Sequence, residues 1–166
     1  DRFAYCYTDG AEGDFDFLTY NSSTGVAITT EVGIDATMLP QVTQMSSNIL
    51  DCATINDTKI AMVWIRSQTG AGTTANVTFS MRTNAGALPT GITNRQLDSS
   101  ISETSHVAVS ALENATIAVV WYNSLGQNLS LHLRNANNYL PIANISIDTA
   151  VGTSSRIATT ALTNGS

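Results

Sequence analysis

The chain has 166 residues, of which only 12 % are charged, and a formal net charge of −6 at pH 7. This length fits one domain with a substantial core. The shortage of Lys and Arg argues against nucleic acid and anionic membrane surfaces as partners, because both are bound through basic residues. No apolar run approaches the roughly 18 residues of a membrane-spanning helix, so no membrane insertion is expected.

In chain order, short segments rich in Val, Ile, Thr and aromatic residues alternate with turns that contain Gly, Asn, Asp and Ser, which is the pattern of β-strands. No segment has a helical period, and residues 37–50, which include Pro40, are expected to form a loop. The sequence therefore predicts an all-β chain. The expected strands are residues 3–7, 15–20, 26–34, 49–55, 60–66, 77–82, 91–97, 106–112, 117–122, 129–134, 140–148 and 157–162.

These strands repeat. The sequence IAMVW at residues 60–64 returns as IAVVW at residues 117–121, and a similar apolar run precedes each copy. A third such leading run, at residues 156–162, ends the chain without its partner, and the matching partner is RFAYCY at residues 2–7. A period of this length indicates a repeat architecture, in which one unit is split between the two ends of the chain.

Four-stranded repeats of about this length are typical of β-propeller blades. Because a propeller closes with about four to eight blades, we predict that two chains form a six-bladed homodimeric ring, in which residues 157–162 of one chain pair with residues 3–7 of the other. The alternatives are a β-sandwich or β-prism within the monomer and an open homo-oligomer. The expected blades of this single domain, residues 1–166, are residues 2–36 plus 156–164, residues 48–100 and residues 105–150.

Seven N-x-S/T sequons occur, several of them in expected turns. Glycosylation requires an exposed loop in a secreted chain, so we expect an extracellular glycoprotein, processed so that Asp1 comes first. The alternative is that the sequons carry no glycan and arise because Asn is favoured in turns and Thr at the starts of strands. Cys6 and Cys52 fall in successive repeats and fit this compartment as a disulfide, or else are buried thiols. The sequons are Asn21, Asn56, Asn76, Asn114, Asn128, Asn144 and Asn164.

The sequence lacks the motifs of nucleophilic, metal-dependent and phosphate-binding enzymes, so we expect no enzymatic activity. Its two histidines and two cysteines have no metal-ligand spacing, and neither a metal nor another cofactor is expected. The acidic cluster of Asp9, Glu12, Asp14 and Asp16 could hold Ca²⁺, but a solvated hairpin loop explains it equally well.

Aromatic residues and arginines recur at equivalent positions. Trp64 and Trp121 share one position and Arg82 and Arg134 share another, and the third copy has Tyr at both. Sugar sites combine an aromatic face with Arg or carboxylate groups that bond hydroxyls, and repeated sites would bind multivalently. The alternative is that the tryptophans form blade-to-blade core and the arginines lie on the surface. The predicted ligand-binding residues are Tyr7, Asp16, Tyr20, Trp64, Arg66, Arg82, Trp121, Tyr122 and Arg134.

The runs RIATTAL and HVAVSAL, FAYCY and IAVVW, and DFDFLTY and LSLHLRN resemble the repeats of the fungal fucose-binding lectins over most of the chain. The resemblance implies a six-bladed propeller and carbohydrate binding. That family's site uses an Arg, a Glu on the next strand and an aromatic residue, whereas here only Asp16 offers a carboxylate on the third strand, so fucose specificity is not implied. We therefore expect a lectin-like protein that binds carbohydrate between blades. The alternative is a structural or adhesive surface glycoprotein that assembles by strand exchange.

Overall fold

The computed structural model describes residues 2–9, 14–29, 32–35, 49–56, 58–67, 74–91, 93–102, 105–152 and 157–160. These ranges contain strands and turns and no helix, which confirms the all-β prediction, and hence no helix that could cross a membrane. The strands are β1 (Arg2–Asp9), β2 (Asp14–Asn21), β3 (Val32–Asp35), β4 (Leu50–Asn56), β5 (Lys59–Ser67), β6 (Thr74–Thr83), β7 (Arg95–Ser102), β8 (His106–Leu112), β9 (Thr116–Asn123), β10 (Asn128–Asn135) and β11 (Pro141–Asp148).

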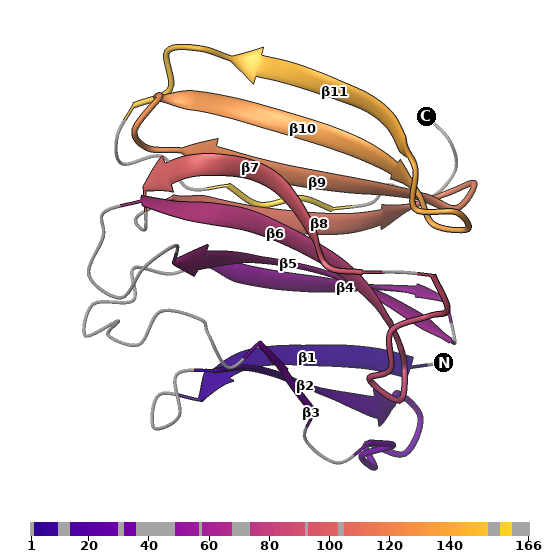
Figure 1. Ribbon diagram of the computed structural model, residues 1–166. Coiled ribbons are helices and arrows are strands. Elements are labelled where there is room, and N and C mark those ends of the chain that lie inside the picture. The colour runs from indigo at the N-terminus through magenta and orange to yellow at the C-terminus, as the bar shows by residue number, and fades with distance from the viewer. Residues whose placement is uncertain are drawn as a thin grey trace.

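The strands form three antiparallel sheets in which neighbours in sequence are neighbours in space (Figure 1). The first sheet is β1-β2-β3, the second is β4-β5-β6-β7 and the third is β8-β9-β10-β11. Antiparallel neighbours of this kind can be joined by short turns. In Figure 1 the sheets are stacked in chain order, with the second between the other two. The described strands of one chain therefore form an open stack and not a closed ring.

The strand pairing has the same register in all three sheets. Tyr20, Arg82 and Arg134, which were assigned one repeat position from the sequence, lie opposite the residues that begin the shared motif: Phe3, Ile60 and Ile117, respectively. The other repeated position also has equivalent partners in each sheet: Tyr7, Trp64 and Trp121 lie opposite Asp16, Thr78 and Ser130, respectively. The sequence repeat is therefore a structural repeat.

The fourth strand of the first two repeats begins later than expected. β7 starts at Arg95 instead of residue 91, because Gly91 adopts a left-handed conformation (φ 78°) that extends the preceding turn. β3 starts at Val32 instead of residue 26, after a turn through Gly25 (φ 66°), and Ala27 forms only an isolated bridge to β2.

The core lies in two layers between the three sheets. In the first layer, Trp64 of β5 packs on Phe15 of β2 with ring centroids 5.3 Å apart, and both side chains are fully buried. In the second layer, the indole Nε1–H of Trp121 in β9 donates to Oδ2 of Asp98 in β7 at 2.8 Å. Burying one aromatic side chain of Phe size stabilises a fold by about 1.5–3 kcal/mol. The repeated tryptophans thus join each sheet to the one before it.

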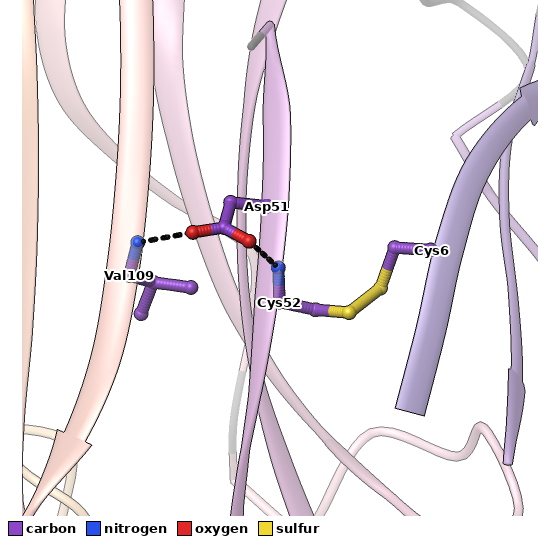
Figure 2. Close-up of a disulfide and its surroundings, with 4 residues drawn as sticks. All are labelled: Cys6, Asp51, Cys52 and Val109. Atoms are coloured by element: carbon purple, nitrogen blue, oxygen red, sulfur yellow. Dashed lines mark hydrogen bonds between the residues drawn. A yellow bond between two sulfur atoms is a disulfide. The ribbon is translucent and has the colours of Figure 1, made fainter. Parts of the chain in front are cut away.

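A disulfide joins the first sheet to the second, as the positions of the two cysteines predicted (Figure 2). Cys6 lies in β1 and Cys52 in β4, with Cα atoms 6.2 Å apart and a sequence separation of 46 residues. β1 and β4 lie against each other without belonging to the same sheet. The bond therefore fixes the distance between two neighbouring repeats.

Asp51 links the second sheet to the third next to this disulfide (Figure 2). Its Oδ2 accepts the backbone N–H of Val109 in β8 at 2.8 Å, and its Oδ1 accepts the N–H of Cys52 at 2.9 Å. β4 and β8 are edge strands of their sheets, and they lie side by side without a shared ladder. One carboxylate thus accepts a backbone amide from each of two facing edge strands.

We expect Asp51 to make the stability depend on pH. Burial raises the pKa of this carboxyl above its ordinary value of 3.8, and the hydrogen bonds from Val109 and Cys52 lower it only in part. The folded state therefore binds the proton more tightly than the unfolded state, so Asp51 adds stability as the pH falls through the folded-state pKa toward 3.8. Urea unfolding between pH 7 and pH 4 should show the wild type gaining stability relative to Asp51→Asn, and parallel pH profiles would contradict this role.

Residues 157–160 lie beside the edges of β4 and β8. The Ser110 hydroxyl of β8 donates to the Thr159 hydroxyl at 2.8 Å, and Ile157, Ala158 and Thr159 line a cavity of about 290 Å³ together with residues of β4 and β8. Residues 157–160 are not in a strand, although the sequence predicted one at residues 157–162. In the predicted ring this segment pairs with residues 3–7 of a second chain.

Exposed apolar side chains concentrate on the two outer sheets and their turns. Tyr5 of β1 is 57 % exposed and Ile142 of β11 is 54 % exposed, whereas in the described part of the middle repeat only Leu88, at 39 %, belongs to this group. Exposed apolar patches of this kind mark surfaces that bind other molecules. The remaining exposed residues are Phe3, Val26 and Ile28 in the first repeat and Leu125, Leu140, Ile145 and Ile147 in the third.

Candidate ligand site between the second and third sheets

The predicted ligand-binding residues do not converge on one site. Five of them have buried side chains: Asp16, Trp64, Trp121, Tyr122 and Arg134. Trp64 and Trp121 occupy the two layers between the sheets, and Tyr122 stacks on His106 with ring centroids 6.4 Å apart. In the single chain these side chains are packed inside the protein.

The predicted residues of the first sheet are more accessible. Tyr7 and Tyr20 are half-buried, and each stacks on an aromatic neighbour in β1. The ring centroids are 5.1 Å apart for Tyr20 and Phe3 and 5.6 Å apart for Tyr7 and Tyr5. Outside the first sheet, Arg66 near the end of β5 is also exposed. Apart from Asp16, the first-sheet candidates are thus part of an exposed aromatic surface.

Arg82 and Arg134 make equivalent contacts in successive sheets. Nη1 of Arg82 donates to the carbonyl of Gly86 at 3.4 Å, and Nη1 of Arg134 donates to the carbonyl of Tyr139 at 3.1 Å. Arg82 also reaches Oδ1 of Asn94 at 3.2 Å through Nη2. Each arginine therefore holds the turn that connects the third and fourth strands of its own sheet.

Arg134 also lines a pocket of about 320 Å³ between the second and third sheets. The start of β7 forms one wall of this pocket, and the turn from β10 to β11 forms the other. This volume is at the lower end of the range for small-molecule sites, about 300–1,000 Å³. The lining residues are Gly91, Arg95, Gln96, Arg134, Asn138, Tyr139, Leu140 and Pro141.

The Arg134 guanidinium is buried against apolar and cationic neighbours. Its side chain is 9 % exposed, its Cζ lies 5.5 Å from the ring centroid of Phe79 in β6, and its Nε has no hydrogen-bond partner. Burial lowers the pKa of Arg134, and the positive charge of Arg95 lowers it further. The two guanidinium groups in this pocket therefore repel each other.

The turn between β10 and β11 is held in one conformation. Oδ1 of Asn135 accepts the N–H groups of Asn137 and Asn138, and Tyr139 has a left-handed backbone (φ 65°). Lys59 of β5 crosses from the second sheet, donates to the carbonyl of Ala136 at 3.2 Å and lies 5.8 Å from the Tyr139 ring centroid. Burial raises the pKa of Tyr139. Contacts from both sheets thus fix this wall of the pocket.

His132 interacts with Arg134 but does not line the pocket. Its ring packs edge-on against Trp121 with centroids 4.6 Å apart. Burial and the charge of Arg134 lower its pKa below the ordinary 6.5, against the opposing effects of Asn144 and Asp98. His132 is therefore neutral at pH 7, and the arginines define the charge of the pocket.

The described residues contain no group of three or more His, Cys, Asp or Glu side chains that could hold a metal ion. The acidic cluster considered from the sequence lies partly outside the described residues, because Glu12 belongs to residues 10–13. Asp16, its last member, is buried in β2 opposite Tyr7.

The sequons differ in accessibility. Asn56, Asn114 and Asn144 are exposed, whereas Asn21, Asn76 and Asn128 are half-buried. Asn56 is the last residue of β4 and Asn114 lies in the turn after β8, so both lie at the connection between the first and second strands of their sheets, as predicted. Asn164 lies outside the described residues. The exposed turns are thus the sites at which a glycan meets least obstruction.

The sequence pattern pointed to Arg134 as a ligand-binding candidate but not to Arg95 or Tyr139, which line the same pocket. Tyr139 follows an Asn-rich turn directly after Arg134, and an aromatic residue in that position is the signal that could have identified it. Arg95 has no counterpart among the aligned repeats. No family model, curated protein or solved structure matches this chain.

Proposed function

We propose that the protein is a secreted, lectin-like carbohydrate-binding protein that forms half of a six-bladed β-propeller. A second copy of the chain completes the ring, and ligands bind between blades. The observation that supports carbohydrate binding best is the pocket between the second and third sheets. It combines guanidinium donors, the amides of Gln96 and Asn138 and the Tyr139 ring, a set of groups suited to a ligand that has many hydroxyls.

Three features support ring closure by a second copy. Among the described strands, β1 has no neighbour on one edge of its sheet, although β5 and β9 at the equivalent position are each paired on both sides. Residues 157–160 lie beside the edges of β4 and β8 and contact Ser110 of β8, where the leading strand of a following repeat would be. Exposed apolar residues are concentrated on both outer sheets. A two-fold dimer would join each free end to the complementary end of its partner.

The experiment is binding of the purified full-length protein to a broad glycan array, after its native oligomer has been verified by sedimentation. We expect retention of at least one glycan class and loss of binding after heat denaturation. An assembled protein that retains no glycan would refute the lectin proposal. The second candidate, an adhesive surface protein that assembles by strand exchange, is favoured by the unpaired β1 edge, and open-ended assemblies in place of a discrete dimer would support it.

Secretion leads to a prediction about the sequons. Protein isolated from its native source should lose mass on enzymatic deglycosylation, and the modified peptides should include the exposed Asn56 and Asn114. The half-buried Asn128 is the internal comparison, because its Oδ1 is buried and the transferase must reach the side-chain amide. Peptide mass spectrometry provides the measurement, and an unchanged mass would argue against a secreted glycoprotein.

A further inference from the structure

We propose that the pocket between the second and third sheets binds the anionic group of an acidic saccharide, a carboxylate or a sulfate, through Arg95 and Arg134. This inference rests on the proposed carbohydrate-binding function and specifies the substrate class. It starts from the composition of the pocket wall, whose described residues include two arginines and no acidic residue. The whole chain has seven basic and thirteen acidic residues, so an all-cationic pocket runs against its overall charge.

The acidic group nearest to this wall in sequence is already engaged. Asp98 lies on β7, the strand that contributes Arg95, but its Oδ2 accepts from Trp121 at 2.8 Å and its Oδ1 accepts the N–H of Ser99 at 2.7 Å. Asp98 is also not among the residues that line the pocket. The structure therefore holds the positive charges of Arg95 and Arg134 in one pocket, while the carboxylate of Asp98 bonds to other groups. A bound anion would relieve the repulsion between the two guanidinium groups.

Arg134 has an unused donor at this position. Its Nη1 is committed to the carbonyl of Tyr139, while Nε is buried and has no hydrogen-bond partner. A buried donor without a partner costs free energy unless a ligand or ordered water satisfies it. An Arg guanidinium pairs with planar or tetrahedral oxyanions through short charge-assisted hydrogen bonds. Arg134 is thus placed to bind, and the exposed Arg95 to attract, a negative group.

The rest of the pocket suits a sugar ring more than a bare anion. Gln96 and Asn138 provide amides that can donate to and accept from hydroxyls, and Tyr139, Leu140 and Pro141 provide apolar surface. The volume of about 320 Å³ suits one small ligand. The acidic net charge of the protein, −6, disfavours an extended polyanion such as nucleic acid, whose binding requires many cations.

The test compares glucuronic acid and glucose 6-sulfate with glucose, by calorimetric or NMR titration of the full-length protein. We expect both acidic sugars to bind at least about tenfold more tightly than glucose, which is the discrimination of roughly one charge-assisted hydrogen bond. Their affinity should fall as salt is added. The NMR signal of the Arg134 Nε–H, identified by its loss in Arg134→Gln, should shift on titration.

Arg95→Gln should weaken both acidic sugars about tenfold and leave glucose unchanged, while Arg95→Lys, which keeps the charge, should weaken them less. Arg66→Gln is the matched control, because Arg66 is also an exposed arginine of the second sheet but does not line the pocket. It should bind like the wild type. Arg95 has an exposed side chain, so its variants test the proposal even if Arg134→Gln does not fold.

Equal affinity for acidic and neutral sugars, or an Arg95→Gln variant with unchanged affinity, would overturn the anionic specificity and leave a neutral lectin. Inorganic sulfate that binds as tightly as glucose 6-sulfate would reveal an anion site that does not recognise the sugar, and would also overturn it. Failure of the proposed function itself is a separate result, because in that case no glycan on the array is retained.

Discussion

Deletion of residues 157–166 is expected to abolish the dimer. In the proposed ring, residues 157–162 supply the strand that pairs with β1 of the second chain, so their loss leaves the β1 edge without a ladder partner. The wild type should sediment as two chains of 17.6 kDa each, and the truncated chain should sediment as a monomer or aggregate. Sedimentation velocity over a range of concentrations measures this directly. A truncated chain that keeps the native mass would refute strand sharing.

Point variants separate loss of assembly from loss of folding. Tyr5→Asp places a charge on the exposed surface of the first sheet, at a side chain that is 57 % exposed, and should weaken the dimer without disturbing the core. Leu88→Asp is the matched control, because Leu88 is also exposed but belongs to the middle repeat. We expect it to leave the mass unchanged. If both variants dissociate the dimer, or neither does, the outer sheets are not the interface.

Removing the Cys6–Cys52 disulfide by a double change to Ser is expected to lower the free energy of unfolding by up to about 4 kcal/mol. This figure is the chain-entropy estimate for a closed loop of 46 residues, and a relaxed unfolded state would reduce it. Urea denaturation of the oxidised wild type and the variant measures the difference. A loss of this size approaches the whole stability of a small domain.

Reduction of the wild type provides the control for this prediction. The reductant should lower the unfolding midpoint of the wild type to that of the Ser variant, and it should leave the variant unchanged. Equal midpoints for oxidised wild type and variant would show that contacts alone set the spacing of the first two sheets, for instance the packing of Trp64 on Phe15.

The sequence was sufficient to predict the features that depend on local pattern. Strand composition and turn residues predicted an all-β chain, and the recurrence of IAMVW as IAVVW predicted the shared register of Trp64 and Trp121. The disulfide was predictable because its two cysteines lie in successive repeats. Predicting these features requires only the two-residue alternation along a strand and the length of the repeat.

What the sequence did not predict depends on contacts between sheets. Arg95 and Tyr139 share a pocket although 43 residues separate their positions, and each belongs to a different repeat. The start of β7 depends on the left-handed Gly91, which a strand pattern does not indicate. Asp51 was read only as part of an apolar run, because its role depends on the edge of a strand in another sheet.

A comparison of the edge strands β4 and β8 explains why the sequence repeat did not indicate this role of Asp51. Ala108 occupies in β8 the register position that Asp51 occupies in β4, as their pairing with Val120 and Val63 shows. The third leading run also has Ala at this point, Ala158. A prediction based on the repeat gives only the residue that the copies share, which is Ala at this position. Asp51 differs from it and accepts the hydrogen bond from Val109.

The junctions between successive repeats are therefore chemically unequal. A covalent bond joins the first sheet to the second, and the half-buried carboxylate of Asp51 joins the second to the third. A neutral hydroxyl pair of Ser110 and Thr159 holds residues 157–160, which would begin the next repeat. In the proposed ring this hydroxyl pair stays within one chain, and the chains meet at two boundaries, where residues 157–162 of each chain pair with β1 of the other. Dilution should then open the ring only at these two boundaries and release intact halves. Multivalent binding would consequently depend on protein concentration, with high avidity where the protein is abundant and single-site affinity where it is scarce.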